Sequence, residues 1–402
     1  MPWRKTSAMD ERCLFVLEAK EHIGPFTELC ARYGISPKTG YKWLKRFNQG
    51  GVAYLADQSR ASRNHPNQIS EEIEKAVLEI RRAHATWGPK KLQVLLHQAN
   101  REISWPCLSS MSRIIKAHGL SIHRKRRRHA TPSTQPFAEC NASNQVWCAD
   151  YKGWFMTGDG HRCDPLTISD GFSRYLLKCQ IVSDLTSEVA WGIFEAAFRE
   201  YGLPDAIRTD NGSPFATTGL GGLSRLSVWW LRLGIRPERI KPGKPQQNGR
   251  HERMHLTLKQ ATAQPPAHTL REQQRRFDSF RQEYNNIRPH ESLQMKTLAS
   301  LYQPSTRPYP ARLPDMEYGR GMEVRRVING EFRWEGGRIF LTHSLNDELI
   351  GLQSCDDRYW RVYFGWLLLG ILDSYNLRIL NALQTKRFEK ALSKGMEYDY
   401  CI

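Results

Sequence analysis

The sequence predicts a multidomain protein: an all-α N-terminal part, a central α/β domain on a mixed sheet, and a small β-barrel towards the C-terminus. Three observations predict this order. A length of 402 residues exceeds what one hydrophobic core usually organises. Apolar residues repeat with helical spacing over the N-terminal third, and strand-like and helical segments alternate in the middle third. The C-terminal part contains short alternating segments separated by Gly-containing turns.

Charge narrows the class of partner. Lys and Arg outnumber Asp and Glu by 59 to 41, which leaves a net charge of +18 and favours a polyanionic partner. The apolar segment "WLLLGIL" is much shorter than the roughly 18 residues that span a bilayer. The N-terminal "MPWRKTSAMDER" lacks the apolar centre of a signal peptide. We therefore expect a cytoplasmic, nucleoid-associated protein whose partner is double-stranded DNA, with no membrane contact.

Residues 1–60 are predicted to form a helix-turn-helix domain. In "TELCARYGISPKTGYKWLKRFNQGG" two helical patterns flank a tight turn at Gly34, Ser36 is the expected N-cap, and Pro37 suits the first helical position. The outward side chains of the second helix are polar and basic, as in a helix that reads the major groove. We assign DNA contacts to Lys38, Thr39, Lys42, Lys45 and Arg46. A helical hairpin with a solvated basic face is the alternative.

Residues 61–130 are expected to form a second helix-turn-helix domain with a basic linker. "SEEIEKAVLEIRRAH", "GPKKLQVLLHQ" and "CLSSMSRIIKAHGL" have the spacing of three short helices. The run "HRKRRRH" follows, and we expect it to contact phosphates, although a solvated linker is the alternative. Its basic residues are Arg124, Lys125, Arg126, Arg127 and Arg128.

Residues 140–301 are predicted to form the α/β domain. "QVWCADYKGWF" is a strand containing Asp150, and "PLTISDGFSRYLLKCQIV" is two strands joined by a turn at Asp170. A helix, the strand "DAIRTD" that ends in Asp210, a Trp-rich helix, a short strand and a helix carrying Glu252 complete the order. The order β-β-β-α-β-α-β-α predicts a mixed sheet flanked by helices.

The segment "IRTDNGSPF" places a carboxylate, Asp210, where a strand must end, because Asn-Gly and Ser-Pro are turn signals. Turn chemistry alone is one explanation. The other is a metal site: Asp150 and Asp210 on neighbouring strands, and Glu252 on the adjacent helix, would repel one another unless a cation lies between them. Oxygen ligands select Mg²⁺ or Mn²⁺ over zinc, and two such ions support in-line displacement at a phosphodiester. We assign Asp150, Asp210 and Glu252 as catalytic residues and ligands of two Mg²⁺ (or Mn²⁺) ions.

Other polar residues are weighed against these three. Glu252, His255 and Lys259 share one face of the predicted helix, and we expect His255 and Lys259 to touch the DNA end, with a solvated polar face as the alternative. The turn at Asp170 favours a structural role for that carboxylate. His290 is expected to brace the core.

The segments "WCADYKGWF", "TDNGSPF", "PQQNGRHER" and "YNNIRPHESL" resemble the integrase-type catalytic core of bacterial insertion-sequence transposases, over about Asn144 to Leu301. The resemblance implies a ribonuclease-H-like fold and an Asp-Asp-Glu metal site at Asp150, Asp210 and Glu252. It implies binding of element ends, DNA cleavage and strand transfer, and a homo-oligomer on DNA. One departure is the 41 residues between Asp210 and Glu252, more than is usual in that family. The alternative function is a DNA-binding regulator with a catalytically silent core.

The C-terminal part is divided by composition. Residues 302–321 are Pro-rich and predict a linker. Residues 322–375 contain short alternating segments with Asn-Gly and Gly-Gly turns, which predict a small barrel, similar to the SH3-like domain that follows the catalytic core in such transposases. Residues 376–402 predict a basic helical tail.

Overall fold

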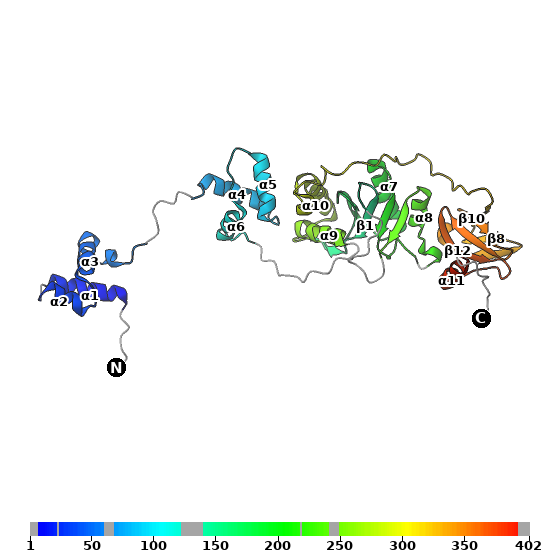
Figure 1. Ribbon diagram of the computed structural model, residues 1–402. Helices are drawn as coiled ribbons and strands as arrows, with labels where there is room; N and C mark the ends of the chain where they lie inside the picture. Colours follow the sequence, from blue (N-terminus) through cyan, green and yellow to red (C-terminus); the bar gives the residue numbers. More distant parts are fainter. Residues whose placement is uncertain are drawn as a thin grey trace. The chain divides into compact units, whose positions relative to one another are not determined.

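The computed structural model describes residues 7–21, 24–59, 68–121, 140–217, 219–240 and 249–392 (Figure 1). The chain divides into two compact units, Met1–Ser70 and Glu71–Ile402. Within the described parts, none of the helices combines the length and apolar character needed to cross a membrane.

The first unit is a three-helix domain that contains the expected helix-turn-helix. Its helices are α1 (Ala8–Lys20), α2 (Phe26–Arg32) and α3 (Pro37–Gly50), followed by the 3₁₀ turn η1 (Gly51–Leu55). Gly34 adopts a φ of +64° between α2 and α3, a conformation that glycine reaches without steric cost. Ser36 caps α3 by accepting the N–H of Thr39, and Pro37 is its first residue, so both predictions are confirmed.

The core of this first unit depends on a glycine. Phe15, Val16, Leu29, Cys30, Trp43 and Leu55 are buried together. A Cβ at Gly40 of α3 would lie 2.7 Å from Cys30 Sγ and 2.8 Å from the Phe15 ring. Because real Cβ atoms do not approach other heavy atoms so closely, any larger residue at this position would force the side chains of α1 and α2 to shift.

The second unit begins with three further helices, α4 (Glu71–Ala83), α5 (Pro89–Ala99) and α6 (Leu108–Ala117). Val77, Leu92 and Met111, one from each helix, are fully buried. The buried guanidinium of Arg81 donates to the carbonyl oxygens of Trp87 and Leu120, which satisfies backbone groups beyond the ends of the helices. This is the second three-helix unit that the sequence predicts.

The central sheet is mixed, as predicted. Its strands are β1 (Val146–Tyr151), β2 (Phe155–Met156), β3 (Arg162–Asp170), β4 (Leu176–Val182), β5 (Ala206–Thr209) and β6 (Arg236–Arg239). The order is β2-β3-β1-β5-β6, and β4 pairs with β3. β1, β3 and β4 pair antiparallel, whereas β1, β5 and β6 pair parallel.

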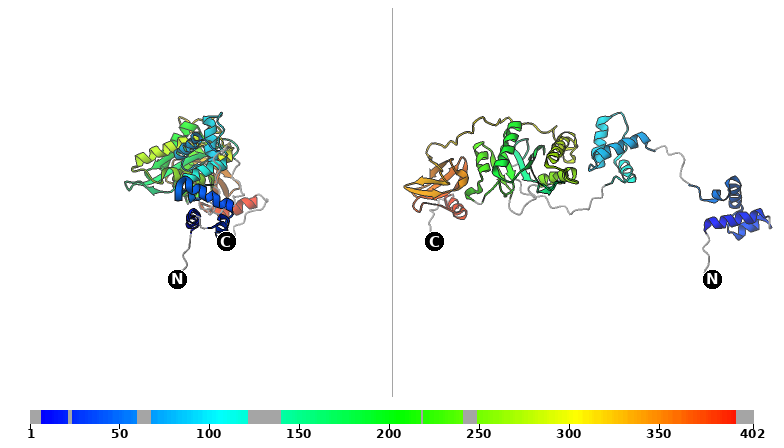
Figure 2. Two further views of the ribbon diagram at one scale, coloured as in Figure 1. Left: turned by 90° about the vertical axis from the view of Figure 1, so that its left-hand side faces the viewer. Right: turned by 180° about the vertical axis from the view of Figure 1, so that it is seen from behind.

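Helices cover both faces of this sheet, and the layers can be followed in Figures 1 and 2. α7 (Ser187–Tyr201) and α8 (Arg225–Arg232), together with the 3₁₀ turn η2 (Leu220–Gly222), belong to one side. α9 (Gly249–Thr262), α10 (Leu270–Gln282), the π-helical turn η4 (Glu283–Ile287) and the 3₁₀ turn η5 (Glu291–Leu293) belong to the other. The predicted order of the main elements is therefore present, with the short β2 added.

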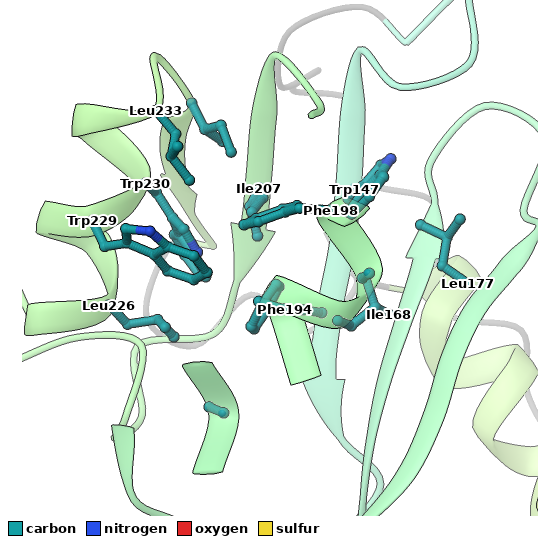
Figure 3. Close-up of a cluster of buried hydrophobic side chains, with 14 of the residues drawn as sticks. Trp147, Ile168, Leu177, Phe194, Phe198, Ile207, Leu226, Trp229, Trp230 and Leu233 are labelled. Atoms are coloured by element: carbon teal, nitrogen blue, oxygen red, sulfur yellow. The ribbon is translucent and has the colours of Figure 1, made fainter. Parts of the chain in front are cut away.

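The main core lies between the sheet and the α7–α8 side (Figure 3). Alternate residues of the strands, among them Trp147, Ile168 and Ile207, meet Phe194 and Trp230 from the two helices. A second cluster lies under α9 and α10 and includes Leu176, Met254, Leu258, Phe277 and Phe280. Since both faces of β1 and β3 are covered, polar side chains that face inward there need partners.

The C-terminal strands form an open arrangement, so the predicted small barrel is not confirmed. β7 (Glu323–Arg326), β10 (Leu349–Ser354), β11 (Tyr359–Phe364), β12 (Leu367–Asp373) and β13 (Arg378–Ile379) form an antiparallel sheet in the order β13-β12-β11-β10-β7. β8 (Glu331–Trp334) and β9 (Gly337–Phe340) form a separate two-stranded sheet, and the 3₁₀ turn η6 (His343–Leu345) follows. Asn329 and Gly330 both have positive φ, which turns the chain into β8 without continuing the ladder of β7.

The region expected to be a helical tail contains both a strand and a helix. β13 lies within it, and helix α11 (Ala382–Leu392) follows. Phe388 of α11 is buried with Tyr359, Ile371 and Leu380. α11 therefore packs on the C-terminal sheet, because one aromatic side chain on its apolar face finds a hydrophobic cluster there.

Candidate active site

Asp150 lies near the end of β1, on the face of the sheet that α9 covers. It stands opposite Thr167 in the antiparallel pairing of β1 with β3. In the parallel pairing of β1 with β5, Cys148 stands opposite Arg208. Continuing that register by two residues brings Asp150 level with Asp210, which directly follows β5. The expectation that the two aspartates come from neighbouring strands is confirmed.

Asp210 begins a turn, and the turn chemistry considered for it is present. Its Oδ1 accepts the backbone N–H of Gly212 at 3.2 Å. The side chain of Asn211 donates to the carbonyl oxygen of Ile240 at 2.7 Å, which ties the turn to the end of β6. These bonds hold the carboxylate at the end of β5, beside Asp150, so the turn also positions the acid.

Glu252 lies in the first turn of α9, and its side chain is exposed. Its negative charge acts on Asp150, which shows that helix and strand bring these two carboxylates near each other. Burial, then the charge of Asp210, and to a smaller extent that of Glu252, raise the pKa of Asp150 to about 7. The three acids form one electrostatic group with an excess of negative charge.

The donor chemistry of this group fits a hard divalent cation. All three side chains offer oxygen, and a cation would relieve the repulsion that raises the pKa of Asp150. The side chains do not form a closed site: across the described parts of the chain, no three His, Cys, Asp or Glu residues stand close enough to hold a metal ion together. The ligand types therefore fit Mg²⁺ or Mn²⁺, while the spacing is looser than a metal-bound site requires.

Comparisons with known families agree with this geometry. An Integrase core domain family matches residues 141–245, and a second family of the same description matches residues 233–297. A Helix-turn-helix domain family matches residues 11–63, and a Homeodomain-like domain family matches residues 39–115. A protein of insertion element IS407 from Burkholderia multivorans is 24% identical over 230 residues, covering 57% of this chain and 79% of that protein. One of insertion element IS476 from Xanthomonas euvesicatoria is 25% identical over 244 residues, covering 59% and 67%.

The chain therefore contains an integrase core and helix-turn-helix domains, and it is similar to proteins of bacterial insertion elements. These similarities support DNA transposition and integration in general terms. Among solved structures, a simian T-cell lymphotropic virus intasome in complex with a PP2A regulatory subunit matches with a TM-score of 0.37 and 18% identity, covering 73% of this chain and 97% of that one. The HTLV-2 integrase catalytic core with magnesium matches with a TM-score of 0.33 and 16% identity, covering 40% and 98%. Both TM-scores are low, so the fold assignment rests on the strand order and the family matches.

The structure corrects the expected face of α9. Glu252 and Lys259 are exposed, whereas His255 is buried at 8% exposure and faces the sheet. Its Nε2 lies 2.7 Å from Thr167 Oγ1, and its Nδ1 lies 4.0 Å from Asp150 Oδ2. Burial lowers the pKa of His255 to about 2, so the ring is neutral. A ring in this position contacts the strands, so the expected DNA contact of His255 is replaced by a contact inside the protein.

Sequence reasoning missed the other members of this buried contact. Thr167 and Ser169 of β3 and His251 of α9 are buried and hydrogen-bonded to one another. Their signal is visible in hindsight: "LTISD" alternates polar and apolar residues, and His251 and His255 are four residues apart on a helix.

The rival acids have structural partners. Asp170 is buried and accepts bonds from the backbone of Asn144 and from Ser173, which supports the structural role expected for it. Glu238 is paired with Arg208 at 2.9 Å. His290 is buried, its Nε2 lies 3.3 Å from the carbonyl oxygen of Tyr284, and burial lowers its pKa to about 4. These contacts agree with bracing of the core.

A basic cavity adjoins Glu252. Its volume is about 750 Å³, and it is lined by residues of α9, the β3–β4 turn and the segment after α10, together with Lys91 of α5. Arg174, Arg253 and Arg288 contribute positive charge, against the carboxylates of Glu252 and Glu291. The excess of guanidinium groups beside a candidate catalytic acid favours an anionic ligand such as a phosphate group.

The basic residues assigned to DNA reading lie on α3. Lys38, Lys42 and Lys45 are exposed, and Thr39 and Arg46 are half-buried. Lys42 and Arg46 both lie over the ring of Trp43, at 4.9 and 5.0 Å from its centroid. These cation–π contacts hold the charged ends of Lys42 and Arg46 near the ring of Trp43, whereas Lys38 and Lys45 are exposed. The predicted phosphate-binding residues Arg124, Lys125, Arg126, Arg127 and Arg128 lie outside the described residues.

Proposed function

We propose that this transposase binds the ends of its element and catalyses DNA cleavage and strand transfer at Asp150, Asp210 and Glu252. The observation that carries the proposal is the placement of three acids: the parallel pairing of β1 and β5 brings Asp210 level with Asp150, and α9 carries Glu252 on the covered face of the same sheet. Burial, the charge of Asp210 and that of Glu252 raise the pKa of Asp150 accordingly. A fold that collects three carboxylates beside a basic cavity supports chemistry on a phosphodiester.

Asp150, Asp210 and Glu252 would hold two Mg²⁺ or Mn²⁺ ions. When bound, such ions supply activation of the attacking water or hydroxyl and stabilisation of the leaving oxygen. The imidazole of His255 lies close to Asp150 but does not make this a zinc site with nitrogen ligands. Its Nε2 is hydrogen-bonded to Thr167, and its Nδ1 lies 4.0 Å from Asp150 Oδ2. The residues therefore favour hard, oxygen-preferring ions.

The protein's own groups position the DNA. The arginines of the cavity beside Glu252 would bind phosphates next to the reacting bond, and Lys259, exposed two turns further along α9, would contact the DNA end. On α3, Lys38, Thr39, Lys42, Lys45 and Arg46 would enter the major groove and read the element's end. The basic run from Arg124 to Arg128 would add contacts to phosphates.

Joining two element ends to a target needs two ends held at once, so we propose that the transposase acts as a homo-oligomer on double-stranded DNA. We also propose that it works in the cytoplasm at the nucleoid, where its DNA partners are.

The experiment that tests the function uses the full chain, Mg²⁺ and DNA carrying the flanking ends of its own gene. Nicked and joined products are expected from the wild type. Asp150→Asn, Asp210→Asn and Glu252→Gln should each abolish these products and leave end binding intact. Asp278→Asn, which changes an exposed acid of α10, is the control and should stay active. Near-normal strand transfer by any one of the three variants would show that the residue is wrongly assigned.

A DNA-binding regulator with a silent core is the second candidate. The observation that favours it is the lack, in the described residues, of three acidic side chains close enough to share an ion. The same experiment separates the two: a regulator binds the ends and gives no products in Mg²⁺ or Mn²⁺.

A further inference from the structure

Four buried polar side chains connect the helix that carries Glu252 to the strands beside Asp150. Thr167 and Ser169 lie on β3, and their exposed fractions are 0% and 7%. His251 and His255 lie on α9, with exposed fractions of 2% and 8%. The two rings are in edge contact, with centroids 4.7 Å apart. Outside these four residues, the buried apolar side chains that α9 adds to the core are Met254 and Leu258.

The hydroxyl of Thr167 is the centre of this group. It donates to the carbonyl oxygen of Asp150 at 3.0 Å. Nε2 of His251 and Nε2 of His255 both lie 2.7 Å from the same oxygen. A threonine hydroxyl has one hydrogen and two lone pairs. Because a carbonyl oxygen can only accept, the single hydrogen goes to Asp150, and both imidazoles must donate their Nε2–H to Thr167.

The remaining protons follow from this assignment. With Nε2 of His251 protonated in a neutral ring, its Nδ1 is an acceptor, and Ser169 Oγ donates to it at 2.9 Å. His255 has the same tautomer, so its Nδ1 presents a lone pair towards Asp150 Oδ2, 4.0 Å away. That distance is too long for a hydrogen bond. His255 therefore donates no hydrogen bond to the carboxylate of Asp150.

These four buried side chains lie between the strand that carries Asp150 and the helix that carries Glu252, two of the proposed metal ligands. Thr167 stands directly opposite Asp150 in the β1–β3 ladder. His251 directly precedes Glu252, and His255 is one turn further along α9. Hydrogen bonds are directional, whereas the two apolar contacts of α9 tolerate rotation and sliding of a helix. Two bonds to one oxygen, from rings one turn apart, set both the rotation of α9 and its position along the strand.

We propose that Ser169, His251, Thr167 and His255 form a positioning network that fixes Glu252 relative to Asp150. This rests on the proposed function, in which both carboxylates hold a divalent ion. The four residues are positioning residues, because they act through Asp150 and Glu252. The hydrogen and both lone pairs of the Thr167 hydroxyl are all used in hydrogen bonds. A residue without a hydroxyl at position 167 would therefore lose all three bonds.

The decisive variant is Thr167→Val, which keeps the shape of the side chain and removes the hydroxyl. It leaves the Nε2–H groups of two buried imidazoles without their acceptor, so α9 must shift or loosen. Thr167→Ser retains the hydroxyl and should restore the network. Thr262→Val is the matched control: Thr262 is also buried and on α9, but its hydroxyl donates within the helix, to Leu258.

Two measurements on the full chain, free of DNA, test the network. Amide hydrogen exchange of α9 should be at least about tenfold faster in Thr167→Val, and close to wild type in Thr167→Ser and Thr262→Val. Mn²⁺ binding, measured by calorimetry, should weaken about tenfold or more in Thr167→Val alone, the size typical for residues that orient metal ligands. In end cleavage, kcat should fall while KM for the DNA stays unchanged.

The outcomes separate this proposal from the function on which it rests. Unchanged exchange of α9 in Thr167→Val would overturn the network whether or not a metal binds. Equal losses in Thr167→Val and Thr262→Val would also overturn it, because they would mean general destabilisation. Faster exchange of α9 in Thr167→Val alone, together with no Mn²⁺ binding by the wild type, would support the network and refute the proposed metal site.

Discussion

Replacing Asp150 by asparagine should stabilise the metal-free protein at alkaline pH. The side chain of Asp150 is 22% exposed, and burial together with Asp210 and Glu252 raises its pKa to about 7. In the unfolded chain, the same carboxyl titrates near its ordinary value of 3.8. Folding at pH 8 therefore places a charge where the protein disfavours it, and asparagine has almost the same shape without that charge.

The pKa difference gives the size of the effect. Between 3.8 and about 7, at about 1.4 kcal/mol per pKa unit, the cost of ionising Asp150 in the folded state is at most about 4 kcal/mol. Below about pH 4 the carboxyl is protonated in both states and costs nothing. Because the folded pKa is the raised one, wild-type stability falls as pH rises from about 4 to about 7. The advantage of the variant should grow over the same window and then stay constant.

The measurement is amide hydrogen exchange of β1 and β5, followed by mass spectrometry in the presence of a chelator. After correction for the intrinsic effect of pH, the exchange rates report the stability of this domain. Asp150→Asn should be better protected than wild type at pH 8, and the difference in free energy should be less than half as large at pH 5. Mn²⁺ should then stabilise the wild type and leave the variant unchanged. Asp278→Asn controls for loss of a surface charge. Equal protection of wild type and Asp150→Asn at pH 8 would refute the electrostatic reasoning.

Three further predictions concern metal, DNA and packing. EDTA should stop end cleavage, Mn²⁺ should replace Mg²⁺, and Zn²⁺ should not support it; full activity in a chelator would contradict a carboxylate metal site. Lys38→Ala and Lys42→Ala should reduce the preference for end DNA over scrambled DNA in paired titrations, whereas neutralising Arg124 to Arg128 should weaken both DNAs alike. Affinity of residues 1–130 should fall by about 10³ or more between about 50 and 200 mM salt if six or more phosphates are contacted. Gly40→Ala should destabilise the first unit by about 1–3 kcal/mol in thermal melts, because its Cβ would overlap Cys30 and Phe15. Gly192→Ala on α7, where a Cβ would meet nothing within 4 Å, should cause no loss.

Much of the fold could be predicted because its signals are local. The turn at Gly34, the cap at Ser36 and the end of a strand at Asp210 depend on the conformations that neighbouring residues allow. The alternation of strand and helix patterns along the chain was enough to predict a mixed sheet flanked by helices. Placing Asp150 and Asp210 side by side required only that two predicted strands be neighbours, and the resemblance to integrase-type cores strengthened that choice.

The face of α9 could not be predicted in the same way. Helical spacing places Glu252, His255 and Lys259 on one side, but the structure buries His255 and exposes the other two. Which side of a polar helix is covered depends on the strand beneath it, and here Thr167 and Ser169 offer partners to histidines. The local pattern also predicted short C-terminal strands correctly, but it predicted a closed barrel where the structure has two separate sheets, because local pattern does not decide which strands pair.

The sequence by itself selected the three candidate acids, since an Asp at a strand end, an Asp within a strand and a Glu at a helix start are local features. Only the tertiary structure decided their electrostatics. The pKa of Asp150 is raised because α9 covers the sheet and buries this side chain, and because Asp210 and Glu252, 60 and 102 positions further along the chain, act on it through their charges. Charge interactions and desolvation depend on distance in space, and the order of residues along a chain does not contain that distance until the chain has folded.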